Sequence, residues 1–277
     1  MGFQFKEFTV DDSRCAMKVG TDGVLIGAWC TAHFWQQPKC SAGLDILDVG
    51  AGSGLISLMM AQRMPEARVV GIELDPDAAS QARENVARSR FSDRIEIAEG
   101  DFTTYGFDRQ FDLIVSNPPY FEREFKGARS TECASACDKE RFISPEKFLT
   151  SGVPREAARH TVTLSFETLT ARAAELLSGD GRFAVILPYS ARTEFIGLCA
   201  MQGLFLSRET RVQGGQGNQG VQEVQGVQEV QEVQGVQVVQ GFKRVMLEFG
   251  REIHPTLRDE LTIGDEKYKE LTNEFYI

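Results

Sequence analysis

Residues 44–54 of the 277-residue chain read LDILDVGAGSG. The apolar run at residues 44–49 predicts a buried strand, and the glycines after it predict a tight turn. Residues 53–64 then read as a helix that Pro65 ends. A strand, a glycine-rich turn and a helix in this order are typical of the edge of an open α/β sheet at which ligands bind.

The rest of the chain repeats this alternation. Further strands are expected at residues 69–73, 95–97, 111–115, 182–187 and 244–249, and further helices at residues 76–90 and 168–177. Strands separated by helices predict a doubly wound, mostly parallel sheet. We expect a single domain with an N-terminal segment (1–43), a core (44–210 and 242–277) and a repeat loop (211–241).

The composition is that of a globular protein, with 42% hydrophobic and 25% charged residues. No apolar run approaches the ~20 residues that cross a bilayer, and residues 1–7 do not look like a secretion signal. The six cysteines are scattered and show no CxxC spacing, so we expect reduced thiols in a cytoplasm. We also expect a monomer that binds neither a membrane nor a metal. The net charge of −10 argues against coating nucleic acid by bulk charge but allows a local basic patch.

Residues 211–241 consist almost wholly of Gln, Val, Gly and Glu, with Gln at every third position from Gln213 to Gln240. A period of three matches neither a strand nor a helix, so it cannot bury one face. The tract is either a sticky interaction segment or an expanded repeat in a surface loop, and we favour the loop. It would join two adjacent strands at the sheet edge farthest from the point where strand order reverses.

The glycine-rich turn has the pattern DxGxGxG, formed by Asp48, Gly50, Gly52 and Gly54. Glycines let the backbone pass close to a ligand. Glu73 ends the next expected strand about twenty residues later, where a carboxylate can bind a ribose diol. The alternative for Glu73 is a solvated charge at the end of a strand.

Asp101 and Phe102 follow the third expected strand. The Asp101 carboxylate can accept a hydrogen bond from an adenine amino group. It can also simply cap a turn, which is a frequent role of aspartate after a strand.

Residues 116–120 read SNPPY directly after the fourth expected strand. Two prolines fix the backbone, so the Asn117 carboxamide and the Pro118 carbonyl can be directed at one amino group. An amine conjugated to its ring is a poor nucleophile, and two acceptors on its N–H bonds would stabilise the charge that develops as it attacks a methyl group. Pro119 completes the turn, and Tyr120 offers a flat face for a planar base.

Together these motifs resemble those of class I S-adenosylmethionine-dependent methyltransferases of the N6-adenine type. That family has a Rossmann-like seven-stranded sheet with one antiparallel strand and helices on both faces. The resemblance implies methionyl contacts at Asp48, Gly50, Gly52 and Gly54, ribose contacts at Glu73, adenine contacts at Asp101 and Phe102, and a target amine at Asn117, Pro118, Pro119 and Tyr120, with Asn117 also facing the cofactor.

Residues 14–29, RCAMKVGTDGVLIGAW, narrow the resemblance. They look like the N-terminal motif of the bacterial tRNA1(Val) adenine-37 N6-methyltransferases. In such enzymes this loop and helix close over the methionine end of the cofactor, which implies contacts from Lys18, Gly20, Thr21 and Asp22. The alternative is an amphipathic surface helix.

Two segments depart from the family pattern: the repeat at 211–241 and a long stretch at 121–155. Residues 123–160 hold eight Lys or Arg against six Asp or Glu, which is compatible with phosphate contacts or with a solvated mixed-charge loop. Weak candidates for RNA contact are Lys126, Arg129, Arg159 and His160. Cys133 and Cys137 have no second pair or nearby histidine, so we expect no metal site.

Other functions stay open at this point. A protein glutamine N5-methyltransferase acting on release factors shares the Asn-Pro-Pro-Tyr motif, but it carries a helical domain before the glycine-rich turn. DNA adenine methyltransferases usually add a recognition domain, and rRNA guanine methyltransferases usually replace the tyrosine. A catalytically inactive binding module is the alternative from another class. The expected function is transfer of a methyl group from S-adenosylmethionine to N6 of a tRNA adenine.

Overall fold

A computed structural model describes residues 2–34, 43–119, 164–215 and 241–276 of the chain. Met1–Pro118 and Ser165–Ile277 form one compact unit, and Pro119–Leu164 form another. The single-domain assignment therefore stays a prediction. No helix in the described ranges is long and apolar enough to cross a membrane.

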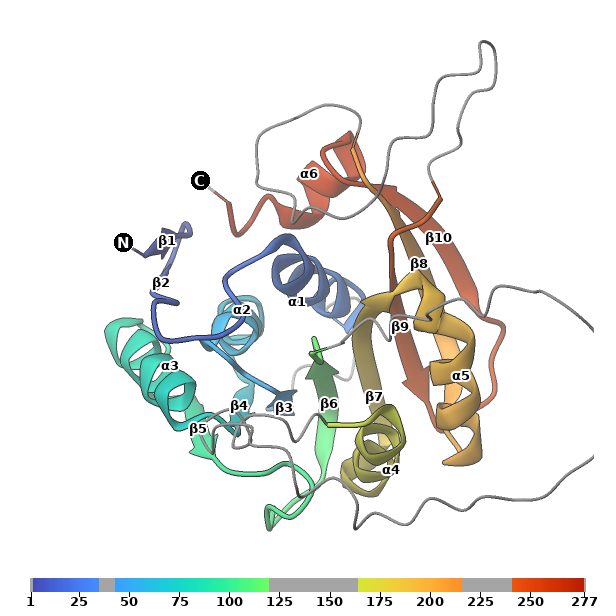
Figure 1. The fold of residues 1–277 in the computed structure, drawn as a ribbon, viewed down its shortest axis with the longest axis horizontal. Helices are drawn as coiled ribbons and strands as arrows, with labels where there is room; N and C mark the ends of the chain where they lie inside the picture. The colour runs from blue at the N-terminus through green and yellow to red at the C-terminus, as the bar shows by residue number, and fades with distance from the viewer. Residues whose placement is uncertain (1, 35–42, 120–163, 216–240, 277) are drawn as a thin grey trace, which may run out of the picture. The chain divides into compact units, whose positions relative to one another are not determined.

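Eight strands within these ranges form one sheet in the order β10-β8-β9-β7-β6-β3-β4-β5 (Figure 1). They are β3 (Asp45–Val49), β4 (Arg68–Glu73), β5 (Ile95–Glu99), β6 (Phe111–Ser116), β7 (Leu177–Pro188), β8 (Phe205–Gln213), β9 (Arg244–Gly250) and β10 (Leu257–Thr262). Only β9 runs antiparallel to its two neighbours. A short hairpin, β1 (Phe3–Gln4) with β2 (Thr9–Val10), lies outside this sheet.

Helices cover both faces of the sheet. Figure 1 shows α1, α2 and α3 on one face and α4 and α5 on the other. Their bounds are α1 (Thr21–Phe34), α2 (Leu55–Arg63), α3 (Pro76–Arg88), α4 (Phe166–Leu176) and α5 (Arg192–Met201), with a 3₁₀ turn (Tyr189–Ala191) before α5 and a last helix, α6 (Glu266–Thr272). Strand β3 is buried along four of its five residues because β4 and β6 flank it and helices cover it.

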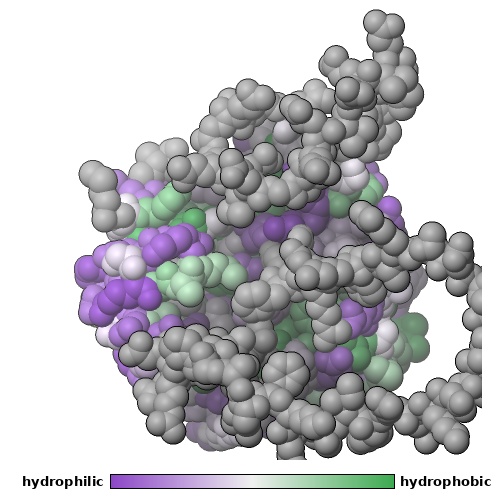
Figure 2. Space-filling view, viewed as in Figure 1, coloured by the Kyte–Doolittle hydropathy of each residue, from purple (hydrophilic) through white to green (hydrophobic). Residues whose placement is uncertain are grey.

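Helix α3 illustrates how sequence directs the local structure. The side chain of Asp75 accepts hydrogen bonds from the N–H groups of Asp77 and Ala78, and Pro76 occupies the first turn. Ala78, Ala82 and Val86 recur at helical spacing and are buried. The outer side is hydrophilic, and Figure 2 shows it as the mostly purple region over α3 at the left.

The expected fold class is confirmed, with one difference. The sheet has eight strands in the described residues where seven were expected, because β10 pairs in parallel with β8 and forms the edge. The expected strands and helices lie within about two residues of their observed bounds, except that β7 begins at Leu177, about five residues before its expected start. The β10–α6 segment was not predicted, because its strand is mostly exposed and polar and shows no apolar run.

The position expected for the repeat needs correction. Strands β8 and β9 are antiparallel neighbours, as expected of strands joined by a hairpin loop. They are not the sheet edge, because β10 lies outside β8. Residues 216–240, which hold most of the tract, lie outside the described residues.

Candidate active site

The glycine-rich turn after β3 is held in a left-handed conformation. Gly50, Gly52 and Gly54 have φ values of 74°, 54° and 79°, which other residues adopt only with strain. The N–H groups of Gly50 and Ala51 both donate to the Ile72 carbonyl at 3.0 Å, so the turn is fixed to β4. A Cβ atom built on Gly50 would have no neighbour within 4 Å among the described atoms. The turn therefore leaves open space over Gly50, where a ligand can approach the backbone.

Glu73 at the end of β4 fixes the same turn from the side. Its Oε2 accepts a hydrogen bond from the Gly52 N–H at 2.8 Å, and its Oε1 accepts from the Asp75 N–H at 2.9 Å. The residue is half-buried. Glu73 is thus not a freely solvated charge at a strand end. Each carboxylate oxygen keeps further acceptor capacity for a ligand.

Asp48 is a fully buried carboxylate one residue before the end of β3. Its Oδ2 accepts from the Ser57 N–H at 3.0 Å and from the Ser57 hydroxyl at 2.7 Å. Its Oδ1 is buried and has no partner among the described residues. Burial raises the pKa of Asp48 to about 7, against the opposing effect of the Ser57 hydrogen bonds. Such an acceptor would gain most from a cationic partner.

Asp101 lies beyond β5 in a turn. Its Oδ1 accepts from the Thr103 N–H at 2.8 Å, so this carboxylate does cap a turn. The N–H of Gly100 donates to the Glu73 carbonyl at 2.9 Å, which brings this turn beside the end of β4. The Phe102 ring is buried and packs near Phe107, so that ring cannot face a ligand without moving. Adenine contacts at Asp101 and Phe102 stay a prediction.

Asn117 directly follows β6, next to the glycine-rich turn. The Ser116 hydroxyl donates to the Val49 carbonyl at 2.9 Å, which ties the ends of β6 and β3 together. The Asn117 Nδ2 lies 3.6 Å from the Met17 sulfur. Its Oδ1 is buried without a partner among the described residues. An unpartnered buried acceptor is costly, so this site invites a donor from a ligand.

The neighbours of Asn117 are described only in part. Pro118 is buried and Pro119 is exposed. The other predicted substrate contacts lie outside the described residues: Tyr120, Lys126, Arg129, Arg159 and His160. The mixed-charge interpretation of residues 123–160 falls there too.

The N-terminal segment reaches this site through Met17, but its predicted cofactor contacts have protein partners. The Lys18 Nζ donates to the Asp12 carbonyl at 2.7 Å. Asp22 pairs with Arg244 of β9 at 2.8 Å. Gly20 and Thr21 form the exposed start of α1, where the Gly20 carbonyl accepts from the Val24 N–H at 3.4 Å. Lys18 and Asp22 therefore hold this segment in place, and direct contact with a cofactor stays a prediction for all four.

Two buried amides on α3 were missed from the sequence. The Asn85 Nδ2 donates to the carbonyls of Asp11 at 2.7 Å and Ser53 at 2.8 Å, which connects the N-terminal segment to the glycine-rich turn. The Gln81 Oε1 accepts from the Ser13 hydroxyl at 3.1 Å. The available signal was the presence of two amides four residues apart on the apolar side of α3. Both are almost fully buried.

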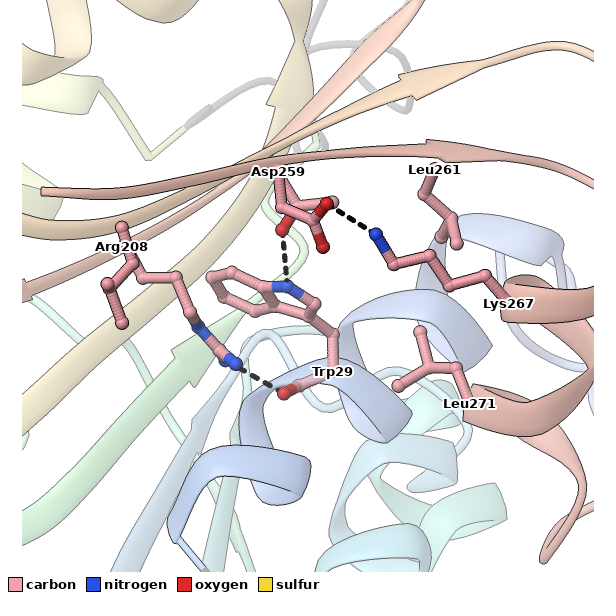
Figure 3. Close-up of a pocket in the computed structure, with 8 residues that line it drawn as sticks. Trp29, Arg208, Asp259, Leu261, Lys267 and Leu271 are labelled. Carbon is pink, nitrogen blue, oxygen red and sulfur yellow. Dashed lines mark hydrogen bonds and ion pairs between the residues drawn. The ribbon is translucent and has the colours of Figure 1, made fainter.

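A cavity of about 290 Å³ lies elsewhere, between α1, β8, β10 and α6 (Figure 3). The Trp29 Nε1 donates to the Thr210 hydroxyl at 2.8 Å, and the Arg208 guanidinium stacks 3.6 Å from the centre of the Trp29 ring. None of the predicted site residues lines it. The described residues also contain no cluster of His, Cys, Asp or Glu arranged for a metal.

Known proteins that resemble this chain are methyltransferases. Residues 32–133 match the model of the methyltransferase small domain. A tRNA1(Val) (adenine(37)-N6)-methyltransferase of Phocaeicola vulgatus is 38% identical over 99% of this chain and 97% of its own length. One of Porphyromonas gingivalis is 44% identical over 76% of this chain and 74% of its own length.

Among solved structures, a predicted O-methyltransferase of Agrobacterium tumefaciens has a TM-score of 0.56 at 17% identity and covers 92% of this chain and 96% of its own. That likeness supports the fold. The Phocaeicola vulgatus relative is similar over nearly the whole sequence. The chain therefore belongs to the tRNA1(Val) (adenine(37)-N6)-methyltransferase family.

Proposed function

We propose that this protein transfers a methyl group from S-adenosylmethionine to N6 of an adenine in tRNA, at position 37 of tRNA1(Val) as the names of its relatives state. One observation carries the chemistry. The Asn117 Oδ1 is a buried acceptor without a described partner, and Ser116 fixes it beside the glycine-rich turn.

The residues around that turn fit the cofactor. The space over Gly50 admits a ligand close to the backbone, and Asp48 supplies a buried acceptor suited to the cationic ammonium of a methionyl group. Glu73 retains acceptor capacity for a ribose diol. When bound, S-adenosylmethionine supplies an electrophilic methyl group. The chain's task is to hold the two reactants and the developing charge.

Asn117 would act on the target amine. Its Oδ1 would accept one N–H of the adenine amino group, and the Pro118 carbonyl would accept the other. As the nitrogen bonds to the methyl carbon, the carbon–sulfur bond would break and S-adenosylhomocysteine would leave. The nitrogen then carries the positive charge, which two fixed acceptors stabilise. The extra proton then leaves to solvent. No covalent link between the protein and the substrate is needed.

The substrate must also change shape. An adenine in an anticodon loop has to be rotated out of its stack to reach Asn117, and Tyr120 would replace part of the lost stacking. We therefore expect action on folded tRNA.

The proposal also includes a monomeric protein in the cytoplasm, where tRNA is found. Cys15, Cys30 and Cys199 are unpaired and buried in the structure, and burial raises the pKa of Cys30 to about 12, so that thiol stays protonated.

The test combines the purified protein with labelled S-adenosylmethionine and unmodified tRNA transcripts, followed by nucleoside mass spectrometry. We expect N6-methyladenosine in tRNA1(Val) and none when adenine 37 is replaced by guanine. A release factor is the second substrate in the same assay. Methylation of its glutamine without any RNA product would establish the alternative, and S-adenosylmethionine binding without either product would indicate an inactive module.

A further inference from the structure

Most ion pairs in the described residues join one cation to one or two carboxylates, but Glu209 on β8 departs from this pattern. Its carboxylate accepts from Arg192 through Nε and Nη2, both at 2.7 Å, and from Arg211 through Nε at 2.9 Å. Arg258 of β10 adds a third guanidinium at 3.5 Å. One fully buried carboxylate thus holds three arginines.

This arrangement leaves positive charge on the surface. Three guanidinium groups carry about fifteen N–H donors, and one carboxylate can accept about four hydrogen bonds. The side chains of Arg192, Arg211 and Arg258 are 23%, 31% and 58% exposed. Glu260 approaches Arg211 only to 4.0 Å. Lys243 is exposed nearby, where its N–H donates to the Val212 carbonyl.

Two aromatic rings, Phe242 and Tyr189, lie beside these arginines. The Arg211 guanidinium lies 5.6 Å from the centre of the Phe242 ring. Phe242 packs against Tyr189, with ring centres 5.4 Å apart. Tyr189 follows β7 directly, and Phe242 lies two residues before β9. We call Tyr189, Arg192, Arg211, Phe242, Lys243 and Arg258, centred on Glu209, the arginine patch.

Strand register places this patch beside the candidate active site. Ser116 of β6 pairs with Val185 of β7, Val185 pairs with Leu247 of β9, and Leu247 pairs with Glu209 of β8. Glu209 is thus level with the residue before Asn117. Strands lie about 4.8 Å apart, so three steps separate the two by about 14 Å along the sheet.

Charge then identifies the ligand class. The whole chain carries −10, so it repels a polyanion at long range. A macromolecular substrate of high negative charge needs a local positive surface close to the reacting base. The arginine patch has four cations against Glu209 and Glu260, an excess of two positive charges, and its centre lies about 14 Å along the sheet from the residue before Asn117.

We infer that the arginine patch binds the phosphate backbone of the RNA whose adenine reaches Asn117. This inference rests on the proposed function and adds the surface that holds the substrate. Glu209 fixes the arginines in position, and their free N–H groups, together with Lys243, contact phosphates. The contacts position the RNA without reading its sequence.

The test uses the full chain and an unmodified tRNA1(Val) transcript with fluorescence anisotropy at several salt concentrations. The double variant Lys243→Ala/Arg258→Ala leaves the Arg192–Glu209–Arg211 contacts intact. We expect its tRNA Kd to rise about tenfold, and the slope of log Kd against log salt to fall by about two. KM for tRNA should rise with kcat and cofactor affinity nearly unchanged.

Arg109→Ala is the matched control, because Arg109 is an exposed arginine paired with Asp45 and Asp108 at the opposite, amino-terminal edge of the sheet. It should bind tRNA like the wild type. If Lys243→Ala/Arg258→Ala binds tRNA with the affinity and salt dependence of the wild type, the inference that the arginine patch binds RNA is wrong. A wild-type protein that methylates no tRNA would instead overturn the proposed function, so the two failures are distinct.

Discussion

Asp48 on β3 and Glu209 on β8 are both fully buried carboxylates of one sheet, yet their pKa values move in opposite directions. Burial raises the pKa of Asp48 to about 7, and among the described residues only Ser57 donates hydrogen bonds that oppose this shift. Hydrogen bonds from Arg192, and then from Arg211, lower the pKa of Glu209 to about 2 despite burial. Burial alone therefore does not set the charge of a carboxylate. The protein completes the environment of Glu209 with its own cations and leaves that of Asp48 open to a ligand.

The largest expected effect concerns Asn117, the proposed acceptor for the target amine. Asn117→Ala removes one acceptor that stabilises charge in the transition state, so we expect kcat for tRNA methylation to fall about 10²–10³-fold with cofactor affinity largely kept. Single-turnover assays and calorimetric titration measure the two quantities. Asn273→Ala changes an exposed asparagine near the C-terminus and should leave both unchanged. Wild-type turnover in Asn117→Ala would remove it from the mechanism.

The second prediction tests whether the Asp48 carboxylate binds the ammonium group of the cofactor. Asp48→Asn keeps one acceptor oxygen for the two Ser57 donors but removes the charge, so we expect S-adenosylmethionine affinity to fall about 10- to 150-fold. Wild-type affinity should rise as pH increases through about 7, because the cation favours the ionised carboxylate. Titrations between pH 5.5 and 8.5 check both, with Asp45→Asn as the control. An affinity that is independent of pH and of this substitution would contradict the idea.

The same substitution should change stability in a way that depends on pH. The folded pKa of Asp48 lies above its unfolded value, so its favourable contribution is complete below about 4 and is lost as pH rises to about 7. Asp48→Asn should therefore gain stability relative to the wild type across that window and stay level above it. Urea unfolding at pH 5 and pH 8 measures the difference.

For Glu209 we expect the opposite dependence of stability on pH. Glu209→Gln removes charged hydrogen bonds and should lower the free energy of unfolding by about 1.5–3 kcal/mol. The folded pKa lies below the unfolded value, so this contribution is present above about 4.5 and is lost only as pH falls through about 2. The deficit should thus be constant between pH 5 and 8. Glu175→Gln, which affects an exposed pair with Arg172, should cost far less.

The smallest expected effect concerns the repeat. Replacing residues 216–240 with a short Gly/Ser turn keeps β8, Phe242 and β9, so cofactor affinity, methylation and melting temperature should change little. Lengthening a loop costs only about 0.6 kcal/mol per doubling, so we expect stability to depend little on the length of this segment. Because both strands that flank it end beside the arginine patch, tRNA affinity is the most informative readout. A large loss of that affinity would mean that the repeat contacts RNA.

The sequence by itself determined six of the eight strands described in the sheet and the active-site turn. The run at residues 44–54 specifies a buried strand and three left-handed glycines, because apolar residues must leave water and only glycine adopts positive φ without strain. The sequence SNPPY after the fourth strand likewise placed Asn117 at the carboxyl end of a strand. These features depend on residues close together in the chain.

Tertiary structure alone decided how distant residues meet. It paired Asp22 with Arg244, placed Asn85 between Asp11 and Ser53, and assembled three arginines from α5, β8 and β10 around Glu209. It also added β10, whose exposed polar sequence gives no strand signal. Such contacts depend on strand order and register, which bring together side chains that the chain itself separates by tens to hundreds of residues.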